Sequence, residues 1–405
     1  MTALNMTNFN NAMKAMYAPG DIPKLGLYDH PLLAMIPKMD KWGGEKYSQP
    51  IQYANNVGRS ATLASAKSAT GNAKFGRFEI STAKRDYAVI QIDGEVVRSS
   101  SMGDATAYLS ARKSEIDASY EALHSSLANA LYRNGGGAKG RVATLPGGNV
   151  ITLTNSNDIA FFEVGMVLQA QTTDGTTAGT LRASTMTITA ITRDEGAATI
   201  TCGGGTVAAL AVNDYLFQSG DIGLKLTGLD AYIPATAPTT TLFGVNRALD
   251  SSRLGGLRYS SSLPLMETIQ RSRAYAAKNG AKITHYFMHP DRWADLELQL
   301  DNKATTDLKS EDGKFGYTAL SVRTPSGVVP VIADADCPID VAWGLKLDDW
   351  KLLSKGACPG PIDHSEGGQG NYFKMMEAED TVEGRIGYYA ELACRAPGNS
   401  IRVAV

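Results

Sequence analysis

The stretch NNVGRSATLASAKSATGNAKFGRF, residues 55 to 78, constrains the fold most because it cannot form a hydrophobic core of its own. It has no acidic residue and few large apolar side chains. Its four basic residues are Arg59, Lys67, Lys74 and Arg77. Such a segment either stays a solvated, flexible loop or is stabilised by contact with another surface. The composition alone leaves both alternatives open.

The flanking sequence predicts that this stretch is the tip of a long β-hairpin over residues 46–98. YSQPIQYA (47–54) precedes it, and RFEISTAKRDYAVIQIDGEVV (77–97) follows with two strand-like runs separated by a charged break. An isolated hairpin has too little apolar surface to be stable. Residues 1–45 predict an N-terminal arm of short helical pieces. Its apolar patch, which we expect to contact another surface, includes Leu32, Leu33 and Ile36.

Residues 99–141 change from strand-like to helical periodicity. Apolar residues recur at helical spacing from Leu109 to Leu131, and Asp104 is a candidate N-cap. The run Gly135 to Gly137 ends the pattern. Thirty helical residues would measure roughly 45 Å, so we predict a long helix that lies along the surface of the protein as a spine.

The next segment, residues 142–224, predicts a small inserted all-β domain. Short alternating runs such as VITLT and MTITAIT are broken by turn sequences. Residues 144–223 contain seven acidic and two basic residues, which gives a net charge of −5. The remaining sequence, 225–365 and then 366–405, predicts an α+β region. It has helices at 262–280 and 291–300, strands at 283–290, 328–334 and 340–347, and two strands near the C-terminus.

Composition excludes several function classes. The 39 basic and 41 acidic residues nearly balance, so no whole-chain field attracts nucleic acid or an anionic membrane. No uncharged apolar run approaches the roughly eighteen residues that span a bilayer, and the first twenty residues lack a secretory signal. The four cysteines form no CxxC pair and predict reduced, buried thiols. We therefore expect synthesis and folding in the cytoplasm.

Sequence motifs of catalysis are missing, and we predict no catalytic, cofactor-binding or metal site. NGGGAKGR (134–141) lacks phosphate-loop spacing and indicates helix termination. His285 and His289 would lie roughly 13 Å apart on a strand, too far to share a metal. Asp334 and Asp336 lack the glycine and glutamate of a calcium loop, which favours a solvated turn.

The order of these parts resembles the major capsid proteins of tailed bacteriophages, which have the Hong Kong 97-type fold. THYFMHPDRWADLELQL (284–300) is similar to the strand and helix of that family. VVPVIADADCPIDVAWGLKLDDWKLLSKG (328–356) is similar to its Val-Pro-Val, loop, strand and Trp segment. FGVNRALDSS (243–252) and GYYAELACRAPGNSIRVAV (387–405) are similar to its linker and final strands. The resemblance omits the 144–223 module.

The resemblance implies an α+β capsid fold with an arm, an extended loop, a peripheral domain that contains the spine helix, and a mainly axial domain over 225–365. It implies a structural protein, not an enzyme and without a cofactor, which self-assembles through pentamers and hexamers into an icosahedral shell around double-stranded DNA. The basic tip and the arm's apolar patch would then contact neighbouring copies. Further implied partners are scaffolding, portal and decoration or cement proteins, with DNA bound without sequence specificity on the inner face and no membrane contact. Assembly would occur in the host bacterial cytoplasm.

Two alternatives remain from the sequence. A tail or baseplate protein would share arms, hairpins and β modules, although the long spine helix argues against it. A hydrolase or glycan-binding protein would carry its site in the β module, which has four aromatic residues and no tryptophan between residues 144 and 223. The acidic module itself either projects outward as a decoration or covers a joint between capsomers.

Overall fold

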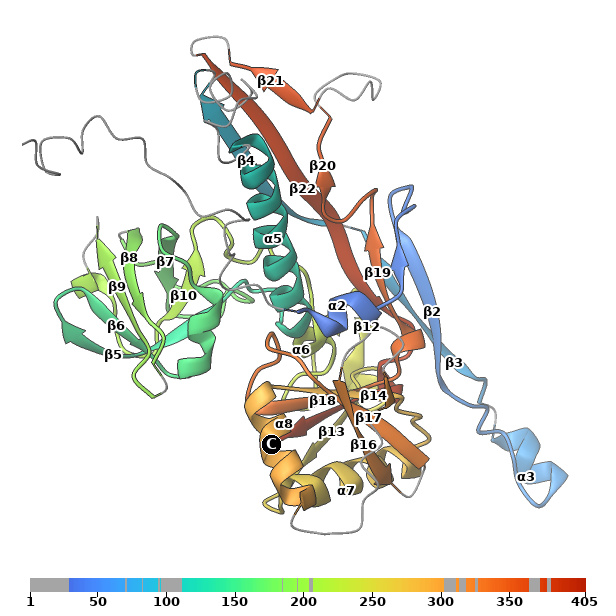
Figure 1. Cartoon of the computed structure of the whole chain (residues 1–405). Helices are drawn as coiled ribbons and strands as arrows, with labels where there is room; N and C mark the ends of the chain where they lie inside the picture. The colour runs from blue at the N-terminus through green and yellow to red at the C-terminus, as the bar shows by residue number, and fades with distance from the viewer. Residues whose placement is uncertain are drawn as a thin grey trace, which may run out of the picture.

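The computed structural model describes most of the chain, and Figure 1 shows it as an elongated molecule with three separate β regions and a projecting hairpin. The described residues are 29–69, 71–81, 83–93, 95, 111–183, 185–194, 196–203, 207–301, 311–312, 318–324, 327–363, 372–376 and 380–405. The predicted N-cap Asp104 and the apolar Leu109 lie outside these ranges.

A six-stranded sheet is built around the long strand β22 (Thr381–Cys394). β4 (Lys84–Asp93) runs antiparallel to it, from the pair Thr381 and Asp93 to the pair Ala390 and Lys84. β19 (Trp350–Ser354), β20 (Gly360–Pro361) and β21 (Phe373–Met375) also pair with β22. The short β1 (Lys38–Met39) adds to β19. Segments from both ends of the chain therefore share one sheet.

The spine helix α5 (Ala111–Tyr132) packs against β4 and β22. Leu123, Leu127 and Leu131 are buried, and Ile116 and Tyr120 pack against the same core. This confirms the predicted apolar stripe from Ile116 onward. Gly135, at φ +88°, follows the helix in the left-handed conformation that ends helices. Two short helices, α2 (Pro31–Met35) and α6 (Leu229–Tyr232), contact α5.

The all-β module is a closed barrel in the order β10-β5-β6-β9-β8-β7. Closure pairs every strand of the barrel, so no strand edge is left open. Val142, Ile200, Phe162 and other apolar side chains fill its separate core. The strands are β5 (Gly140–Gly147), β6 (Val150–Leu153), β7 (Val167–Gln171), β8 (Met186–Thr192), β9 (Thr199–Gly203) and β10 (Tyr215–Gln218); the 3₁₀ helices are η2 (Ser156–Phe161) and η3 (Val207–Ala209).

The other half is a seven-stranded mixed sheet in the order β13-β23-β18-β14-β17-β16-β15. α7 (Leu265–Lys278) and α8 (Pro290–Asp301) pack on it, which confirms both predicted helices. Arg273 of α7 is buried and donates to the carbonyl of Ile283. The strands are β13 (Leu257–Ser260), β14 (His285–Met288), β15 (Glu311–Asp312), β16 (Thr318–Thr324), β17 (Gly327–Ala333), β18 (Val341–Leu345) and β23 (Ile401–Ala404).

The hairpin is shorter than predicted. β2 (Tyr47–Ala54) pairs only with β3 (Lys74–Ile80), and the short helix α3 (Leu63–Ser68) lies in the tip. The prediction that the run after residue 84 belongs to the hairpin is wrong, because β4 pairs with β22 in the spine sheet. Apolar side chains lie on both faces of β4: Ile90 and Ile92 are buried under α5, and Tyr87 and Val89 are on the exposed face.

Candidate functional site

The described part of the chain presents several exposed surfaces that another molecule could contact. Within the described ranges, no three His, Cys, Asp or Glu side chains are grouped so that they could hold a metal ion. The four cysteines are free, and Cys202, Cys337 and Cys394 are buried. A search for long apolar helices in the described part of the chain finds none that could cross a membrane.

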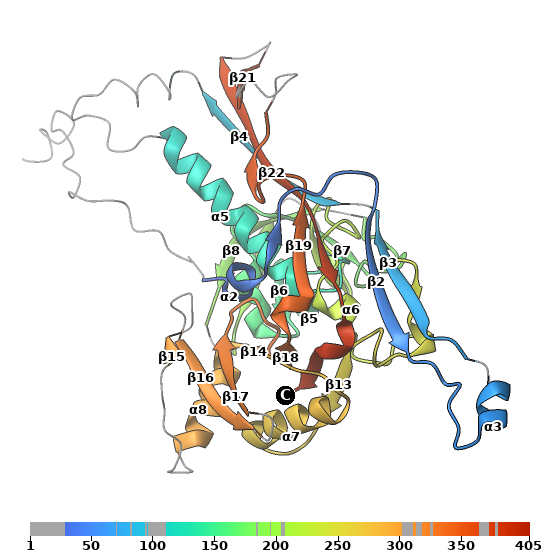
Figure 2. The same ribbon diagram turned by 90° about the vertical axis from the view of Figure 1, so that its right-hand side faces the viewer.

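The first exposed surface is the hairpin, which extends away from the body in two perpendicular views (Figures 1 and 2). From residue 43 to residue 77, no described residue is buried. Thr62 caps α3 by accepting a hydrogen bond from the Ser65 amide, yet that helix buries none of its side chains. The tip therefore has local structure without a core.

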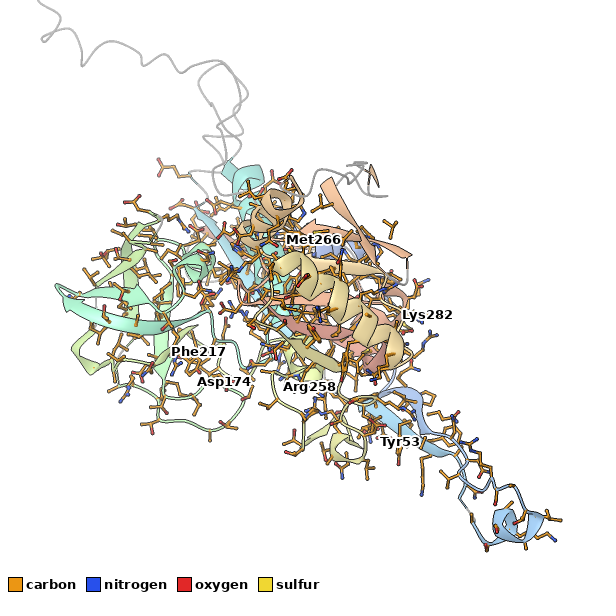
Figure 3. All side chains as sticks on the ribbon, turned by 90° about the horizontal axis from the view of Figure 1, so that it is seen from below. Tyr53, Asp174, Phe217, Arg258, Met266 and Lys282 are labelled. Atoms are coloured by element: carbon orange, nitrogen blue, oxygen red, sulfur yellow. The ribbon has the colours of Figure 1, made fainter. Side chains whose placement is uncertain are left out.

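The base of the hairpin is fixed to the body. Phe78 is buried with Val245 and Leu254. The Glu79 amide donates to the Phe243 carbonyl at 2.8 Å. Arg253 Nη1 donates to the Tyr53 carbonyl at 2.6 Å, and Figure 3 shows Tyr53 where the hairpin leaves the body. A fixed base and an unburied tip give a hairpin that is held out from its own chain.

Three of the four predicted basic contact residues lie on this unburied part with free charges. Arg59, Lys67 and Lys74 are exposed, and no ion pair joins them to an acidic group among the described residues. Arg77 instead pairs with Glu79 on the same strand, which lowers the pKa of Glu79. Arg77 is thus partly neutralised within the hairpin.

The tip also exposes apolar side chains that sequence reasoning did not single out. Val57, Leu63 and Phe75 are 68%, 71% and 68% exposed. Only their size and their place in a polar stretch could have marked them in the sequence. Together with the free basic groups, they give the tip a mixed apolar and positive surface of the kind found at protein interfaces.

The predicted apolar contact patch of the arm is wrong. Leu32, Leu33 and Ile36 are 1%, 4% and 2% exposed, because α2 packs against α5 and the spine sheet of its own chain. These side chains complete the main core and offer no surface to a neighbour. The prediction failed because the sequence does not show that the arm folds back onto the helix.

A buried polar cluster holds α2 in this position. The Leu32 amide and the Tyr132 hydroxyl both donate to Asp334 Oδ2, at 3.1 and 2.8 Å. His30 Nδ1 lies 2.6 Å from Asp336 Oδ2. Asp334 and Asp336 are both buried, so the expectation of a solvated turn is wrong. They connect the arm, the spine helix and the turn after β17.

Protonation of this cluster follows from its burial. Burial, reinforced by the adjacent charge of Asp336, raises the pKa of Asp334 to about 7. Burial alone would lower the pKa of His30, but the hydrogen bond and charge of Asp336 outweigh it, so the pKa is raised. His30 and Asp336 also line an open pocket of about 740 Å³ beside α5. Because the hydrogen bonds of Asp334 and Asp336 join the arm, the spine helix and the turn after β17, we assign the cluster a structural role.

A second exposed surface is the face of the spine sheet opposite α5. Ile90 and Ile92 are buried in the main core with the helix, whereas Tyr87 and Val89 point the other way and are exposed. The Tyr87 and Tyr389 hydroxyls are 3.0 Å apart. These residues line an open groove of about 730 Å³. Five of the six residues in YAVIQI (87–92) are apolar or aromatic, so the sequence pattern alone does not separate the two faces.

Comparisons with solved structures identify the fold. A chain of the cyanophage A-1(L) capsid asymmetric unit is similar over 96% of each chain, with 12% identity and a TM-score of 0.56. The capsid of a native GTA particle is similar over 99% of each chain, with 9% identity and a TM-score of 0.52. The holo-SrpI encapsulin complex from Synechococcus elongatus PCC 7942 is similar over 100% of this chain and 96% of its own, with 8% identity and a TM-score of 0.50.

Sequence comparison alone does not find this relation, since no family model and no curated protein matches the chain. At identities of 8% to 12%, the solved structures show the fold and leave the activity to be argued from the surfaces. The similarity covers nearly the whole of both chains, so it includes the hairpin, the spine helix and both sheets and is not limited to one of them. The chain has the Hong Kong 97-type capsid fold.

Proposed function

We propose that this chain is a major capsid protein of a tailed bacteriophage. It assembles through pentamers and hexamers of itself into the icosahedral shell that encloses double-stranded DNA. Its place is the virion, its assembly site is the host bacterial cytoplasm, and it has no catalytic role. The observation that carries the proposal is the hairpin, in which no described residue between 43 and 77 is buried.

The hairpin supports assembly because it exposes apolar side chains that would be more stable against another protein surface than in water. Burying Val57, Leu63 and Phe75 against another copy would remove apolar area from water, at about 25 cal/mol per Å². A fixed base reduces the ordering entropy that docking would otherwise cost. Each contact is weak by itself, but closure into a shell makes many contacts mutually dependent.

The three free basic groups of the tip give this docking its orientation. Arg59, Lys67 and Lys74 would face acidic groups on the neighbouring copy. Arg77 is less suited to that role because Glu79 already partners it. The groove beside Tyr87 and Val89 is a further surface that a neighbouring copy would cover.

Other partners follow from the same proposal. DNA would contact the inner face without sequence specificity, and scaffolding, portal and decoration or cement proteins would bind the assembled shell. The acidic barrel supports an outward position, since negative charge facing packaged DNA would be repelled. Deletion of residues 146–221 tests the decoration role: particles that still form would support it, and loss of all particles would contradict it.

Electron microscopy of the purified chain, together with sedimentation velocity, tests assembly. A charge-reversed variant carries Arg59→Glu, Lys67→Glu and Lys74→Glu. A matched control reverses three exposed basic residues on the body, Arg271, Lys278 and Lys282. We expect shells or regular capsomers from the natural chain and the control, and loss or malformation in the hairpin variant. Equal assembly by all three proteins would contradict the hairpin's role.

A further inference from the structure

The joint between the barrel and the rest of the chain is unusually close. The chain leaves α5 at Arg133, enters the barrel through Gly135 to Gly137, and returns through residues 219–228. The amide of Gly223 donates to the Gly136 carbonyl at 2.8 Å, so the entering and returning segments are bonded to each other. The Lys139 amide adds a bond of 2.9 Å to the Leu216 carbonyl.

Glycine is required in this joint by close backbone approach. A Cβ atom on Gly136 would lie 2.0 Å from the Asp174 carbonyl oxygen. A Cβ atom on Gly175 would lie 2.2 Å from the Gly136 carbonyl oxygen. The glycine run, explained above by helix termination, therefore also lets the barrel loop at 174–175 pack directly on the linker. Asn134 Nδ2 donates to Asp174 Oδ2 at 2.7 Å and fixes that loop.

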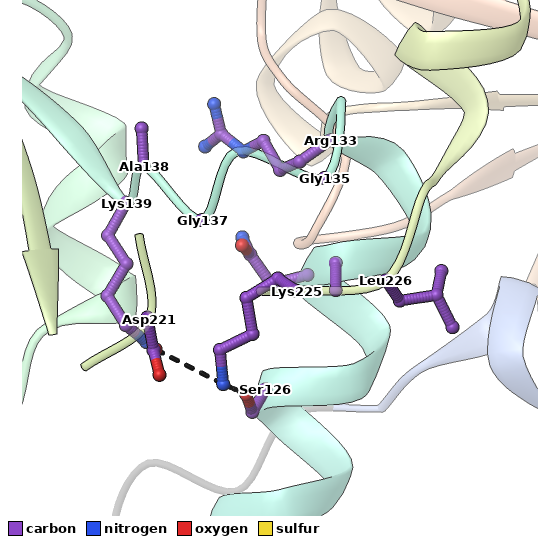
Figure 4. Close-up of a pocket in the computed structure, with 11 residues that line it drawn as sticks. Ser126, Arg133, Gly135, Gly137, Ala138, Lys139, Asp221, Lys225 and Leu226 are labelled. Atoms are coloured by element: carbon purple, nitrogen blue, oxygen red, sulfur yellow. Dashed lines mark hydrogen bonds and ion pairs between the residues drawn. The ribbon is translucent and has the colours of Figure 1, made fainter. Parts of the chain in front are cut away.

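Lys225 fixes the returning segment to the spine. Its Nζ lies 2.5 Å from Asp86 Oδ2 on β4 and 3.1 Å from Asp221 Oδ2, and it donates to Ser126 Oγ on α5 at 3.1 Å. Figure 4 shows Lys225 between Asp221 and Ser126. The side chains of Lys225, Asp86 and Asp221 are 10%, 16% and 15% exposed. Removing one partner would leave a nearly buried charge uncompensated.

The barrel reaches both halves of the fold through η2. Toward the spine, Arg133 Nη2 donates to Asp158 Oδ1 at 2.9 Å, and its guanidinium lies 5.4 Å from the ring centroid of Phe161. Toward the seven-stranded half, Asn157 Nδ2 donates to Asp291 Oδ2 in the first turn of α8 at 2.7 Å. Arg193 holds η2 to the barrel by donating to the Ile159 and Phe162 carbonyls.

We propose that the barrel is an internal brace, docked rigidly on the spine through the Gly136 and Lys225 joint, which connects α5 to α8 and limits motion between the two halves of the chain. A closed barrel with its own packed core moves as a rigid body, so a contact at one side of the barrel restricts the position of the other side. The brace goes beyond the proposed capsid function and does not depend on it, because all of its contacts lie within one chain. The brace gives the acidic insertion a mechanical role within the chain, in addition to the proposed role as a decoration on the outside of the shell.

Hydrogen exchange on the full, unassembled chain tests the joint. Gly136→Ala inserts a methyl group against the Asp174 carbonyl, whereas Gly43→Ala is a control with nothing within 4 Å of the new Cβ. We expect amides in 134–139 and 219–226 to exchange at least about tenfold faster in Gly136→Ala, with the control unchanged. Exchange equal to that of the control in a folded Gly136→Ala protein would overturn the rigid joint.

Distances between spin labels test the brace, and they remain informative if Gly136→Ala does not fold. Labels at exposed Ala190 and Ala294 join the barrel to α8, and labels at Ala118 and Ala294 join the spine to α8. Asn157→Ala removes the side-chain contacts with Asp291 and His289 on the seven-stranded half, together with a local contact to Ser156 Oγ. We expect both distance distributions to broaden in this variant. Unchanged distributions would overturn the brace, whether or not the chain forms shells.

Discussion

Glu391 permits a quantitative prediction, because it is a carboxyl group only 1% exposed at the centre of the spine sheet. Its Oε1 accepts hydrogen bonds from the amides of Thr227, at 2.8 Å, and Leu392, at 3.2 Å. Thr227 lies in the segment, residues 219–228, that returns from the barrel. Burial raises the pKa of Glu391 to about 8, although both hydrogen bonds and the charge of Lys84 oppose the rise. The folded chain therefore holds a proton that the unfolded chain releases.

The sign and size of the effect follow from linkage. The neutral carboxyl stabilises the fold fully below the unfolded pKa of 4.5, and this contribution is lost as pH rises through about 8. Integrating between these two values predicts that the free energy of unfolding falls by about 4 kcal/mol from pH 5 to pH 8.5 because of this group. Glu391→Gln cannot ionise, while its Oε1 can accept the same two hydrogen bonds.

Urea unfolding of the natural chain and Glu391→Gln, followed by tryptophan fluorescence at pH 5 and pH 8.5, measures this effect. The difference between the two proteins cancels the other titrating groups, such as Asp334 and His30. We expect the variant to gain about 4 kcal/mol relative to the natural chain between the two pH values. A stability difference that stays the same within about 1 kcal/mol at both pH values would refute the reasoning.

The remaining predictions concern the core, the buried cluster and the hairpin tip. Leu127→Ala should lower the free energy of unfolding by about 2–5 kcal/mol because Leu127 is fully buried, and urea unfolding checks this. Tyr132→Phe leaves Asp334 without one donor and should cost about 1–3 kcal/mol by the same assay; an unchanged midpoint would contradict the hydrogen bond's role. Leu63→Ser with Phe75→Ser should change monomer stability by no more than about 0.5 kcal/mol but reduce assembly measured by light scattering.

Much of the fold is predictable from local pattern. The stripe from Ile116 to Leu131 repeats at helical spacing because one face of α5 is buried on a sheet, and that burial is what the structure shows. The helices near 265–278 and 290–301 have comparable signals. The alternating Thr-rich runs after residue 142 predict β structure, which the structure closes into a barrel.

What could not be predicted depends on contacts distant in sequence. β4 looks like a hairpin strand until β22, near the other end of the chain, is known to pair with it. Leu32 and its neighbours looked available for a partner because nothing local shows that Asp334 and Tyr132 hold α2 on the spine.

The candidate contact surface was found only in part. Charge composition identified Arg59, Lys67 and Lys74, because an acid-free stretch is visible in the sequence itself. The pairing of Arg77 with Glu79 depends on side-chain geometry and was not foreseen. The role of the glycines at 135–137 in docking the barrel also required the structure, since the atoms they approach lie near residues 174 and 221.

The central claim, that a hairpin without a core of its own is completed by another copy of the chain, is tested most directly by electron microscopy of particles from the purified natural chain at near-atomic resolution. The account predicts closed shells in which residues 55–75 are buried against a neighbouring copy, with Arg59, Lys67 and Lys74 facing acidic groups. Shells in which this stretch stays exposed to solvent, or a chain that stays monomeric even with co-expressed viral assembly factors, would contradict it.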